Sequence, residues 1–376
     1  MLRVGVVGCG KIADDHCSQI QRIQGCEIVG ACDRELLMAK QLSERFPIKQ
    51  YFDDVAEMLS KTHPDVVHVC TPPQSHFAIT MQSLDAGCHV YVEKPFALCL
   101  EDARTMIALA TRKGLKITAG HDDQFRHVAR RMRALVREGF LGSDPVHMES
   151  YYCYDLGGSG YAKALLGDKQ HWVRKLPGKL LHNVISHGIA RIAEFFSGDA
   201  PKVIAFGFIS PGLRSRGESE IIDELRVILS DEDRATAYFT FSSQMRPALH
   251  QFRIYGEKNS LILDQDKETL IKLRGKSYAS YAEKFIPPIG FANQYLANVR
   301  TNLRVFLARD FHMKAGMKYL IDSFYKSILQ DAVPPIPYRE ILLTTQIMDS
   351  IFEQLNQIPR RVHVPLEASL HSNAAI

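Results

Sequence analysis

Short apolar runs alternate with amphipathic segments over roughly the first third of the chain, a rhythm typical of βαβ units. The runs are rich in Val and Ile and lack polar alternation, as expected of strands that helices cover on both faces. This pattern predicts a parallel sheet. The expected strands are residues 3–7, 27–32, 65–71, 89–93 and 116–119, and the helices between them are residues 12–23, 36–46, 54–61, 77–86 and 100–112.

The pattern changes after Gly120. Residues 125–138 and 180–196 have a helical period, and residues 146–154 alternate as a strand. From residue 202 to 274 strand follows strand, with turn signals such as the Gly-Glu-Lys-Asn segment at 256–259. Further helices are expected at residues 293–311, 314–329 and 339–355, followed by a loose tail at residues 365–376.

Together these elements predict two domains. Residues 1–122 are expected to form an α/β Rossmann domain with a parallel, doubly wound sheet. Residues 123–376 are expected to form an α+β domain with an open, largely antiparallel sheet. The last helix, about residues 338–355, is a candidate to pack back on the first domain.

Composition narrows the class of protein further. The chain has 376 residues, of which 46% are hydrophobic and 23% charged, as in ordinary globular proteins. Its net charge of +4 is too mild to indicate nucleic-acid binding. The eight cysteines form no C-x-x-C pair, so no metal site is predicted and a reducing, cytoplasmic location is expected. No apolar stretch reaches the ~20 residues of a membrane helix, and no targeting segment is expected.

A glycine-rich segment, Gly8-Cys9-Gly10-Lys11-Ile12-Ala13, follows the first strand and opens the first helix. In this context G-x-G-x-x-G/A indicates dinucleotide binding. Gly8 permits the tight turn, Gly10 lets the backbone approach the pyrophosphate, and Ala13 keeps helix and sheet close. The helix N-terminus at Lys11 and Ile12 offers free N–H groups to the phosphates. The alternative is a glycine turn without a ligand.

Two further segments extend this candidate cofactor site. Asp33 ends the second strand, where an acid accepts hydrogen bonds from ribose hydroxyls and repels a 2′-phosphate. The acid therefore favours NAD. Arg34 beside it could hold a 2′-phosphate, so NADP stays open. Thr71-Pro72-Pro73 ends the third main strand at the carboxyl edge, where ligands of such sheets bind.

Glu93-Lys94-Pro95 follows the next strand. With this element, the glycine fingerprint, and His76 after the Thr-Pro-Pro segment, the chain resembles the glucose-fructose oxidoreductase / inositol dehydrogenase (Gfo/Idh/MocA) family over essentially its whole length. The resemblance implies that Glu93 and Lys94 lie where nicotinamide and substrate meet, and that Lys94 hydrogen-bonds the reacting hydroxyl. His76 either caps the following helix or touches the nicotinamide side. Taken alone, Lys94 would be one solvated lysine among many.

The family's second element is a helix with Asp and His four residues apart, and residues 177–187 match it with Asn183 and His187. Spacing of four places both side chains on one helical face. The resemblance implies that His187 is the general acid/base, a role that the ordinary pKa of histidine suits. Asn183 stands where the family has aspartate; an amide is no base but can orient a hydroxyl. The alternative is a histidine satisfied within its helix.

Other side chains near these motifs are candidates for substrate binding, or else ordinary core and surface residues. Aromatic faces suit a sugar ring, and cations suit a phosphate or carboxylate. Family members often carry Arg-Phe where this chain has Gln124-Phe125, which leaves substrate recognition open. The candidates are His121, Gln124, Tyr152, Trp172, Arg174 and Asn183.

The resemblance implies an NAD(P)-dependent oxidoreductase that transfers hydride to or from a secondary alcohol or ketone of a sugar, cyclitol or sugar nucleotide. Two alternatives stay open: an NAD-retaining glycosidase with transient sugar oxidation, and a non-catalytic dinucleotide-binding sensor or regulator. The resemblance also implies that residues 123–376 bind substrate and mediate oligomerisation, because antiparallel sheets in this family commonly pair into dimers or tetramers, so a homodimer or homotetramer is expected. A basic amphipathic stretch at residues 293–314 fits either a membrane surface or a partner subunit.

Overall fold

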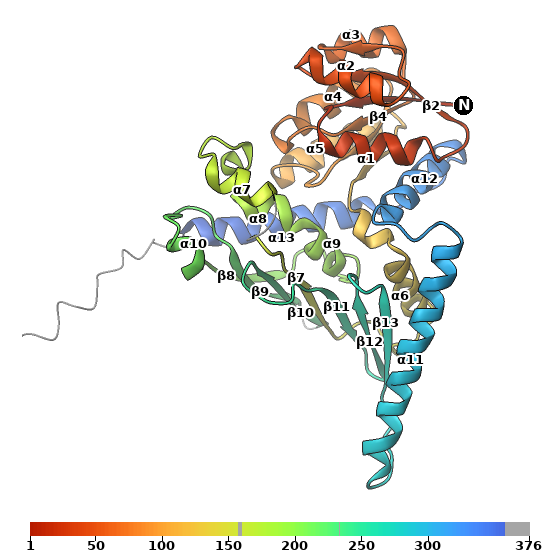
Figure 1. Ribbon diagram of the computed structural model, residues 1–376, viewed down its shortest axis with the longest axis vertical. Helices are drawn as coiled ribbons and strands as arrows, with labels where there is room; N and C mark the ends of the chain where they lie inside the picture. The colour runs from red at the N-terminus through yellow and green to blue at the C-terminus, as the bar shows by residue number, and fades with distance from the viewer. Residues whose placement is uncertain (157–159, 233, 358–376) are drawn as a thin grey trace, which may run out of the picture.

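The computed structural model describes residues 1–156, 160–232 and 234–357, so the tail expected at residues 365–376 lies outside the described residues. Two sheets organise the chain (Figure 1). The N-terminal sheet and its helices form one layered unit, and the second sheet lies below it in this view. Helices α9 (Ser186–Ala193) and α13 (Tyr338–Gln357) cover the side of the second sheet that faces the N-terminal unit.

The first sheet is parallel and has the strand order β3-β2-β1-β4-β5-β6. This is the doubly wound order of a Rossmann domain, so the predicted fold class is confirmed. β4 is buried along its whole length because helices cover both faces of the sheet. The strands are β1 (Leu2–Val7), β2 (Cys26–Cys32), β3 (Tyr51–Phe52), β4 (Val66–Val69), β5 (His89–Val92) and β6 (Ile117–Ala119).

Five helices alternate with these strands, and short 3₁₀ helices lie at two of the loops that matter for the site. The helices are α1 (Lys11–Ile20), α2 (Leu36–Arg45), α3 (Val55–Thr62), α4 (His76–Asp85) and α5 (Leu100–Arg112). The 3₁₀ helices are η1 (Pro73–Ser75), before α4, and η2 (Asp122–Phe125), at the crossing into the second half of the chain.

The second sheet has the order β13-β12-β11-β7-β10-β9-β8 and is antiparallel except where β10 pairs with β7. Burial alternates along β7, as expected when one face of a sheet packs on helices and the other does not. Its strands are β7 (His147–Tyr152), β8 (Lys202–Phe208), β9 (Glu224–Asp231), β10 (Ala235–Ser242), β11 (His250–Tyr255), β12 (Asn259–Asp264) and β13 (Thr269–Arg274).

The remaining helices connect the two halves. α12 (Ala315–Leu329) packs on α1 and η2 and contributes Leu320 and Phe324 to the hydrophobic core of the Rossmann sheet. α13 contacts α5 on one side and α9 on the other. The others are α6 (His127–Arg137), α7 (Gly160–Gly167), η3 (Trp172–Lys175), α8 (Lys179–Val184), α10 (Pro211–Arg214) and α11 (Ala282–Leu307). In the described part of the chain, no helix has the length and apolar character needed to cross a membrane.

Two helical predictions need correction. The single helix expected at residues 180–196 is interrupted at Ile185 and forms α8 and α9. A side-chain donor binds a carbonyl of α8 there, and such a donor competes with the helical hydrogen bonds. The helix expected from residue 293 begins at Ala282 instead and includes Pro287 and Pro288. Proline removes a donor but keeps a helical φ, so the prolines masked these turns in the sequence.

Candidate active site

The loop between β1 and α1 has the shape of a phosphate cradle. Gly8 has φ +92°, and a Cβ there would lie 2.7 Å from the backbone of Cys70 and Thr71. A Cβ at Gly10 would meet nothing within 4 Å, so the space before the helix is open. Gly10 caps α1 without a side-chain hydrogen bond, which leaves the N-terminal N–H groups to a ligand. The residues present therefore fit a dinucleotide pyrophosphate.

The other predicted cofactor residues line the same carboxyl edge of the sheet. Asp33 lies at the end of β2, and its carboxylate accepts hydrogen bonds from the backbone N–H of Cys9 at 2.7 Å and of Glu35 at 3.0 Å. Arg34 is exposed beside it. Lys11 is also exposed, and Ile12 is half-buried.

His76 joins two loops of this edge. It is buried, and its ring nitrogens lie 3.0 Å from the carbonyl oxygen of Pro95 and 2.9 Å from that of Thr71. It thereby connects the loop of Pro72 and Pro73 to the loop after β5. This position supports both loops rather than capping α4 by a side-chain hydrogen bond.

Lys94 reaches from the Rossmann sheet to the second half of the chain. It follows β5, and its Nζ donates to the backbone oxygen of Asn183 on α8 at 3.1 Å. Its own backbone N–H donates to Glu93 Oε2 at 3.2 Å. The structure thus brings the Glu-Lys-Pro element to the paired helices α8 and α9, which carry Asn183 and His187, 89 and 93 residues away from Lys94 in the sequence.

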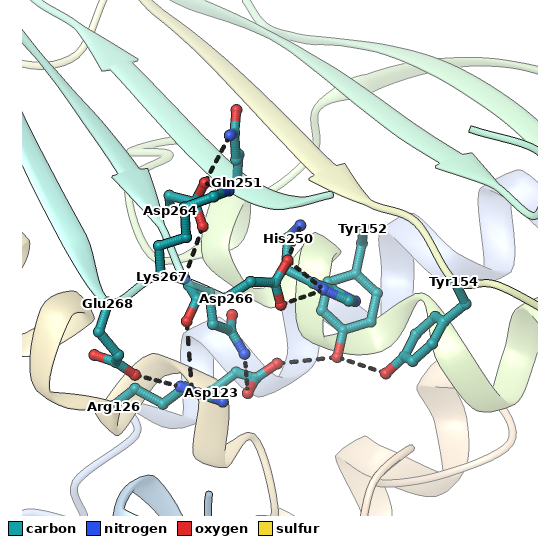
Figure 2. Close-up of polar contacts among 11 residues, drawn as sticks. Asp123, Arg126, Tyr152, Tyr154, His250, Gln251, Asp264, Asp266, Lys267 and Glu268 are labelled. Atoms are coloured by element: carbon teal, nitrogen blue, oxygen red, sulfur yellow. Dashed lines mark hydrogen bonds and ion pairs between the residues drawn. The ribbon is translucent and has the colours of Figure 1, made fainter. Parts of the chain in front are cut away.

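His187 on α9 faces two carboxylates of η2. Its Nδ1 lies 3.9 Å from Asp122 Oδ1 and 3.8 Å from Asp123 Oδ2, and has no hydrogen-bond partner among the described residues. Asp123 is fixed from the other side, since Tyr152 donates to its Oδ2 at 2.9 Å and Gln265 donates to its Oδ1 at 2.6 Å (Figure 2). Neither Asp122 nor Asp123 was among the predicted site residues.

Burial and charge separate the protonation behaviour of these groups. Burial lowers the pKa of His187 to about 4, so the imidazole is neutral near pH 7 and can accept a proton. Burial, aided by the charge of Asp123, raises the pKa of Asp122 to about 7. Burial opposes ionisation of Asp123 as well, but positive charge from His187 and Arg191 lowers its pKa below the ordinary value. One carboxylate therefore stays charged while its neighbour titrates near neutrality.

Asp122, Asp123 and His187 could offer ligand atoms to a metal ion, because these atoms lie within 4.8 Å of one another. Both Asp123 oxygens are already engaged by hydrogen-bond donors. The buried guanidinium of Arg191, one helical turn beyond His187, adds positive charge next to Asp123. These donors and this positive charge already compensate Asp123, so the arrangement suits proton transfer better than metal binding.

A small cavity adjoins the site between the loop after β5, α8, α9 and α13. Three buried polar atoms of residues lining it have no hydrogen-bond partner among the described residues: His121 Nε2, His182 Nδ1 and Ser186 Oγ. Buried polar atoms are rarely left unpaired, so an ordered water or a ligand group is expected there. The His121 ring also lies 6.0 Å from the His187 ring, centroid to centroid.

Three predicted substrate contacts have structural partners instead. The amide of Gln124 donates to Ala190 O at 3.3 Å and to Glu194 Oε2 at 3.0 Å. Arg174 pairs with Glu218 at 2.6 Å. The Trp172 ring is half-buried and stacks on His171, while its carbonyl accepts from Gln74 at 3.0 Å. These contacts give all three a structural role, whereas Tyr152, His121 and Asn183 lie next to His187 or Lys94.

A buried hydrogen-bonded row behind Glu93 was not predicted. Glu93 Oε1 lies 2.9 Å from His16 Nε2, His16 Nδ1 lies 2.8 Å from His68 Nδ1, and His68 Nε2 lies 2.8 Å from the Tyr325 hydroxyl. All four side chains are buried. They come from four separate elements, so no local spacing in the sequence could have indicated the row.

Comparison with known proteins agrees with this architecture. Residues 2–121 match the family model described as an oxidoreductase family with an NAD-binding Rossmann fold, and residues 129–262 match the GFO/IDH/MocA C-terminal domain. Because these two matches together cover more than half of the chain, it belongs to the Gfo/Idh/MocA family, whose N-terminal domain is an NAD-binding Rossmann fold.

Two curated relatives match only part of this chain. The D-glucoside 3-dehydrogenase of Escherichia coli is 37% identical over 142 residues, which are 38% of this chain and 40% of that enzyme. The D-apiose dehydrogenase of Paraburkholderia graminis is 30% identical over 37% of each chain. This chain spans 36% to 48% of the length of the first curated relatives it matches.

The fold is shared over nearly the whole chain with a solved structure. The WlbA dehydrogenase of Bordetella pertussis, in complex with NADH and UDP-GlcNAcA, superposes with a TM-score of 0.74 over 94% of this chain and 95% of that one. The identity is 17%, so this likeness concerns the fold.

Proposed function

We propose that the protein is an NAD(P)-dependent dehydrogenase that oxidises a secondary alcohol of a sugar, cyclitol or sugar nucleotide, or reduces the corresponding ketone. One observation carries this proposal. Lys94, at the carboxyl edge of the Rossmann sheet, hydrogen-bonds α8 and lies close enough to the neutral His187 on α9 that, beyond burial, its charge helps to lower the pKa of that histidine. A cation and a base at that edge are the groups that hydride removal from an alcohol requires.

Each site residue has its own role in the proposed reaction. Lys94 Nζ, held by Asn183 O, donates to the substrate oxygen and stabilises negative charge that develops on it. His187 accepts the hydroxyl proton. Asp122, whose pKa is about 7, then receives or returns that proton when its 3.9 Å separation from His187 closes in the substrate complex. Asn183 orients a second substrate hydroxyl.

Bound NAD(P) would supply the hydride acceptor or donor. The backbone of Gly8, Gly10, Lys11 and Ile12 would hold its pyrophosphate, and Asp33 would bind the adenosine ribose, which favours NAD over NADP.

The substrate class rests on the site and on the relatives. The curated relatives include dehydrogenases of a glucoside and of apiose, and a structural neighbour is named as a complex with a sugar nucleotide. The buried Tyr152 ring lies 5.8 Å from the His187 ring and packs edge-on against Tyr154, whose partly exposed ring offers aromatic surface suited to a sugar ring. We therefore place sugars and sugar nucleotides first among the candidate substrates.

The test follows nicotinamide absorbance while the purified protein meets NAD or NADP and a panel of sugars, cyclitols and sugar nucleotides. We expect turnover that falls by about 10²-fold to 10⁴-fold in Lys94→Ala and His187→Ala. Lys202→Ala, which removes an exposed lysine at the start of β8, is the matched control and should retain activity.

Two results would overturn the proposal. Glycoside cleavage without net change in absorbance would identify an NAD-retaining glycosidase. Ligand binding that both variants retain, with no turnover in the wild type, would identify a sensor. Loss of cofactor affinity in either variant would show that the residue holds the cofactor and leave its chemical role unsupported.

A further inference from the structure

Helix α11 docks on the second sheet by its polar side. β13 is an edge strand of the sheet, so half of its backbone groups lack a strand partner. Gln294 supplies both partners for Lys272: its Oε1 accepts from the backbone N–H at 2.7 Å and its Nε2 donates to the carbonyl at 3.1 Å. Asn298 does the same for Leu270, at 3.1 and 3.0 Å. Asn302 donates to Lys267 O at 3.2 Å.

The side of α11 that faces away from the sheet is apolar. Its large side chains recur at intervals of four and three residues over three heptads, and the six larger than alanine are 55% to 65% exposed. This narrow seam is the a/d pattern of a coiled coil. The seam residues are Phe285, Ile289, Ala292, Leu296, Val299, Leu303 and Phe306.

Figure 1 shows α11 standing beside β13 with its N-terminal end projecting past the sheet. We propose that this seam pairs with the same seam of a second copy of the chain, as an antiparallel two-stranded coiled coil centred on Leu296. The pairing is independent of the proposed enzymatic function.

The charge of α11 favours another helix over a membrane surface. Interfacial helices combine an apolar side with a strongly charged one. Only four of the 26 residues of α11 are charged, none of them in the seam, and its polar side is occupied by the amide contacts with β13. Depletion of charge and enrichment in aromatic residues are typical of the centre of a protein interface.

The order of side-chain sizes favours an antiparallel pair. Reversing the seam about Leu296 places Phe285 near Phe306 and Ile289 near Leu303. It also places the small Ala292 opposite the larger Val299, whereas a parallel pair would set Ala292 against itself and leave a gap. The sequence of the seam is therefore close to self-complementary under a two-fold axis, as an isologous interface requires.

The area available is adequate for a dimer. An aromatic side chain buries 150–250 Å², so Phe285, Tyr295 and Phe306 alone, at 53% to 65% exposure, would contribute roughly 350 Å² per chain. A stable interface needs roughly 800 Å² per partner, and the aliphatic seam residues add to the aromatic contribution.

The test measures the mass of the full chain in solution by light scattering after gel filtration. We expect twice the chain mass of 42.4 kDa for the wild type and the single-chain mass for Leu296→Glu and Val299→Glu. Both positions are exposed in the single chain, so thermal unfolding should show an intact fold. Leu37→Glu on α2, similarly exposed at 64%, is the matched control and should stay dimeric. Phe206→Glu probes the competing surface, the open face of the second sheet, where Ile204, Phe206 and Ile228 are also exposed; a dimer held by the seam should survive it.

Cysteine cross-linking tests the direction of the pair. Leu296→Cys should form a disulfide-linked dimer by itself, and Ile289→Cys should cross-link to Leu303→Cys but not to itself. Self-linking of Ile289→Cys would overturn the antiparallel arrangement. A monomeric wild type, or a dimer that Phe206→Glu breaks and Leu296→Glu spares, would overturn the seam as an interface. Binding of a monomeric wild type to vesicles containing phosphatidylglycerol would assign the seam to a membrane instead.

Discussion

The Nδ1 atoms of His16 and His68 lie 2.8 Å apart in the interior of the Rossmann domain. Although burial opposes it, the hydrogen bond from His16 lowers the pKa of Glu93 to about 2, so Glu93 accepts from His16 Nε2. His16 Nδ1 shares a second hydrogen bond with His68 Nδ1, and His68 Nε2 shares a third with the Tyr325 hydroxyl. The α12 helix is thereby connected, through three buried hydrogen bonds, to the residue that precedes Lys94.

This row predicts a stability difference between two buried tyrosines. Tyr325→Phe leaves His68 Nε2 without its hydrogen-bond partner, and we expect the free energy of unfolding to fall by about 1–3 kcal/mol. Tyr91→Phe is the matched control, because the Tyr91 hydroxyl is equally buried and has no hydrogen-bond partner among the described residues. Its removal should be neutral or stabilising. Equal losses in the two variants, measured by denaturant unfolding, would contradict the role given to the row.

Sequence patterns predicted the parts of the site that are contiguous in the chain, but not the contacts between distant segments. Gly8, Gly10 and Asp33 could be predicted because strand, turn and helix follow one another directly, and their order carries the meaning. Lys94 and His187 were found only through the family resemblance, since neither is unusual by itself. The pairing of His187 with Asp122 spans 65 residues, and no periodicity relates the two positions.

Helix α11 shows a second limit of sequence reasoning. Hydrophobic periodicity predicts which side of a helix is apolar, and the default is that this side faces the core. Here Gln294 and Asn298 satisfy the edge of β13, so the polar side faces the protein and the apolar side faces outward. Only the structure shows this inversion.

The cradle predicts opposite outcomes at its two glycines. Gly8→Ala forces a side chain onto a position with φ +92°, 2.7 Å from the backbone after β4, and should cost on the order of 1–3 kcal/mol of stability. Gly10→Ala meets no protein atom within 4 Å, so the fold should be unaffected, while the methyl group intrudes where the pyrophosphate approaches. Thermal unfolding and NADH fluorescence titration separate the effects. Full NADH affinity in Gly10→Ala would contradict the assigned cradle.

Asp122 also predicts a dependence of stability on pH. Its pKa is raised from 3.8 to about 7 in the folded protein, so the native state binds this proton more tightly than the unfolded state does. Stability from this group is present below pH 4 and is lost as pH rises through about 7. Asp122→Asn should therefore raise Tm relative to the wild type more at pH 8 than at pH 5. A difference that does not change with pH would show that Asp122 is not perturbed.

The same carboxylate should shape the pH profile of turnover. In the direction of alcohol oxidation, Asp122 must be ionised to take the proton from His187, so kcat should rise as pH increases through about 7. Asp122→Asn should remove this rising limb of the pH profile and lower kcat at pH 8 by about tenfold or more. Asp85→Asn, which neutralises an exposed carboxylate on α4, should leave the pH profile unchanged. His187 is not the source of the limb, because its pKa of about 4 keeps it neutral across the range. A limb near pH 7 that survives in Asp122→Asn would assign the titration to another group and remove Asp122 from the proton route.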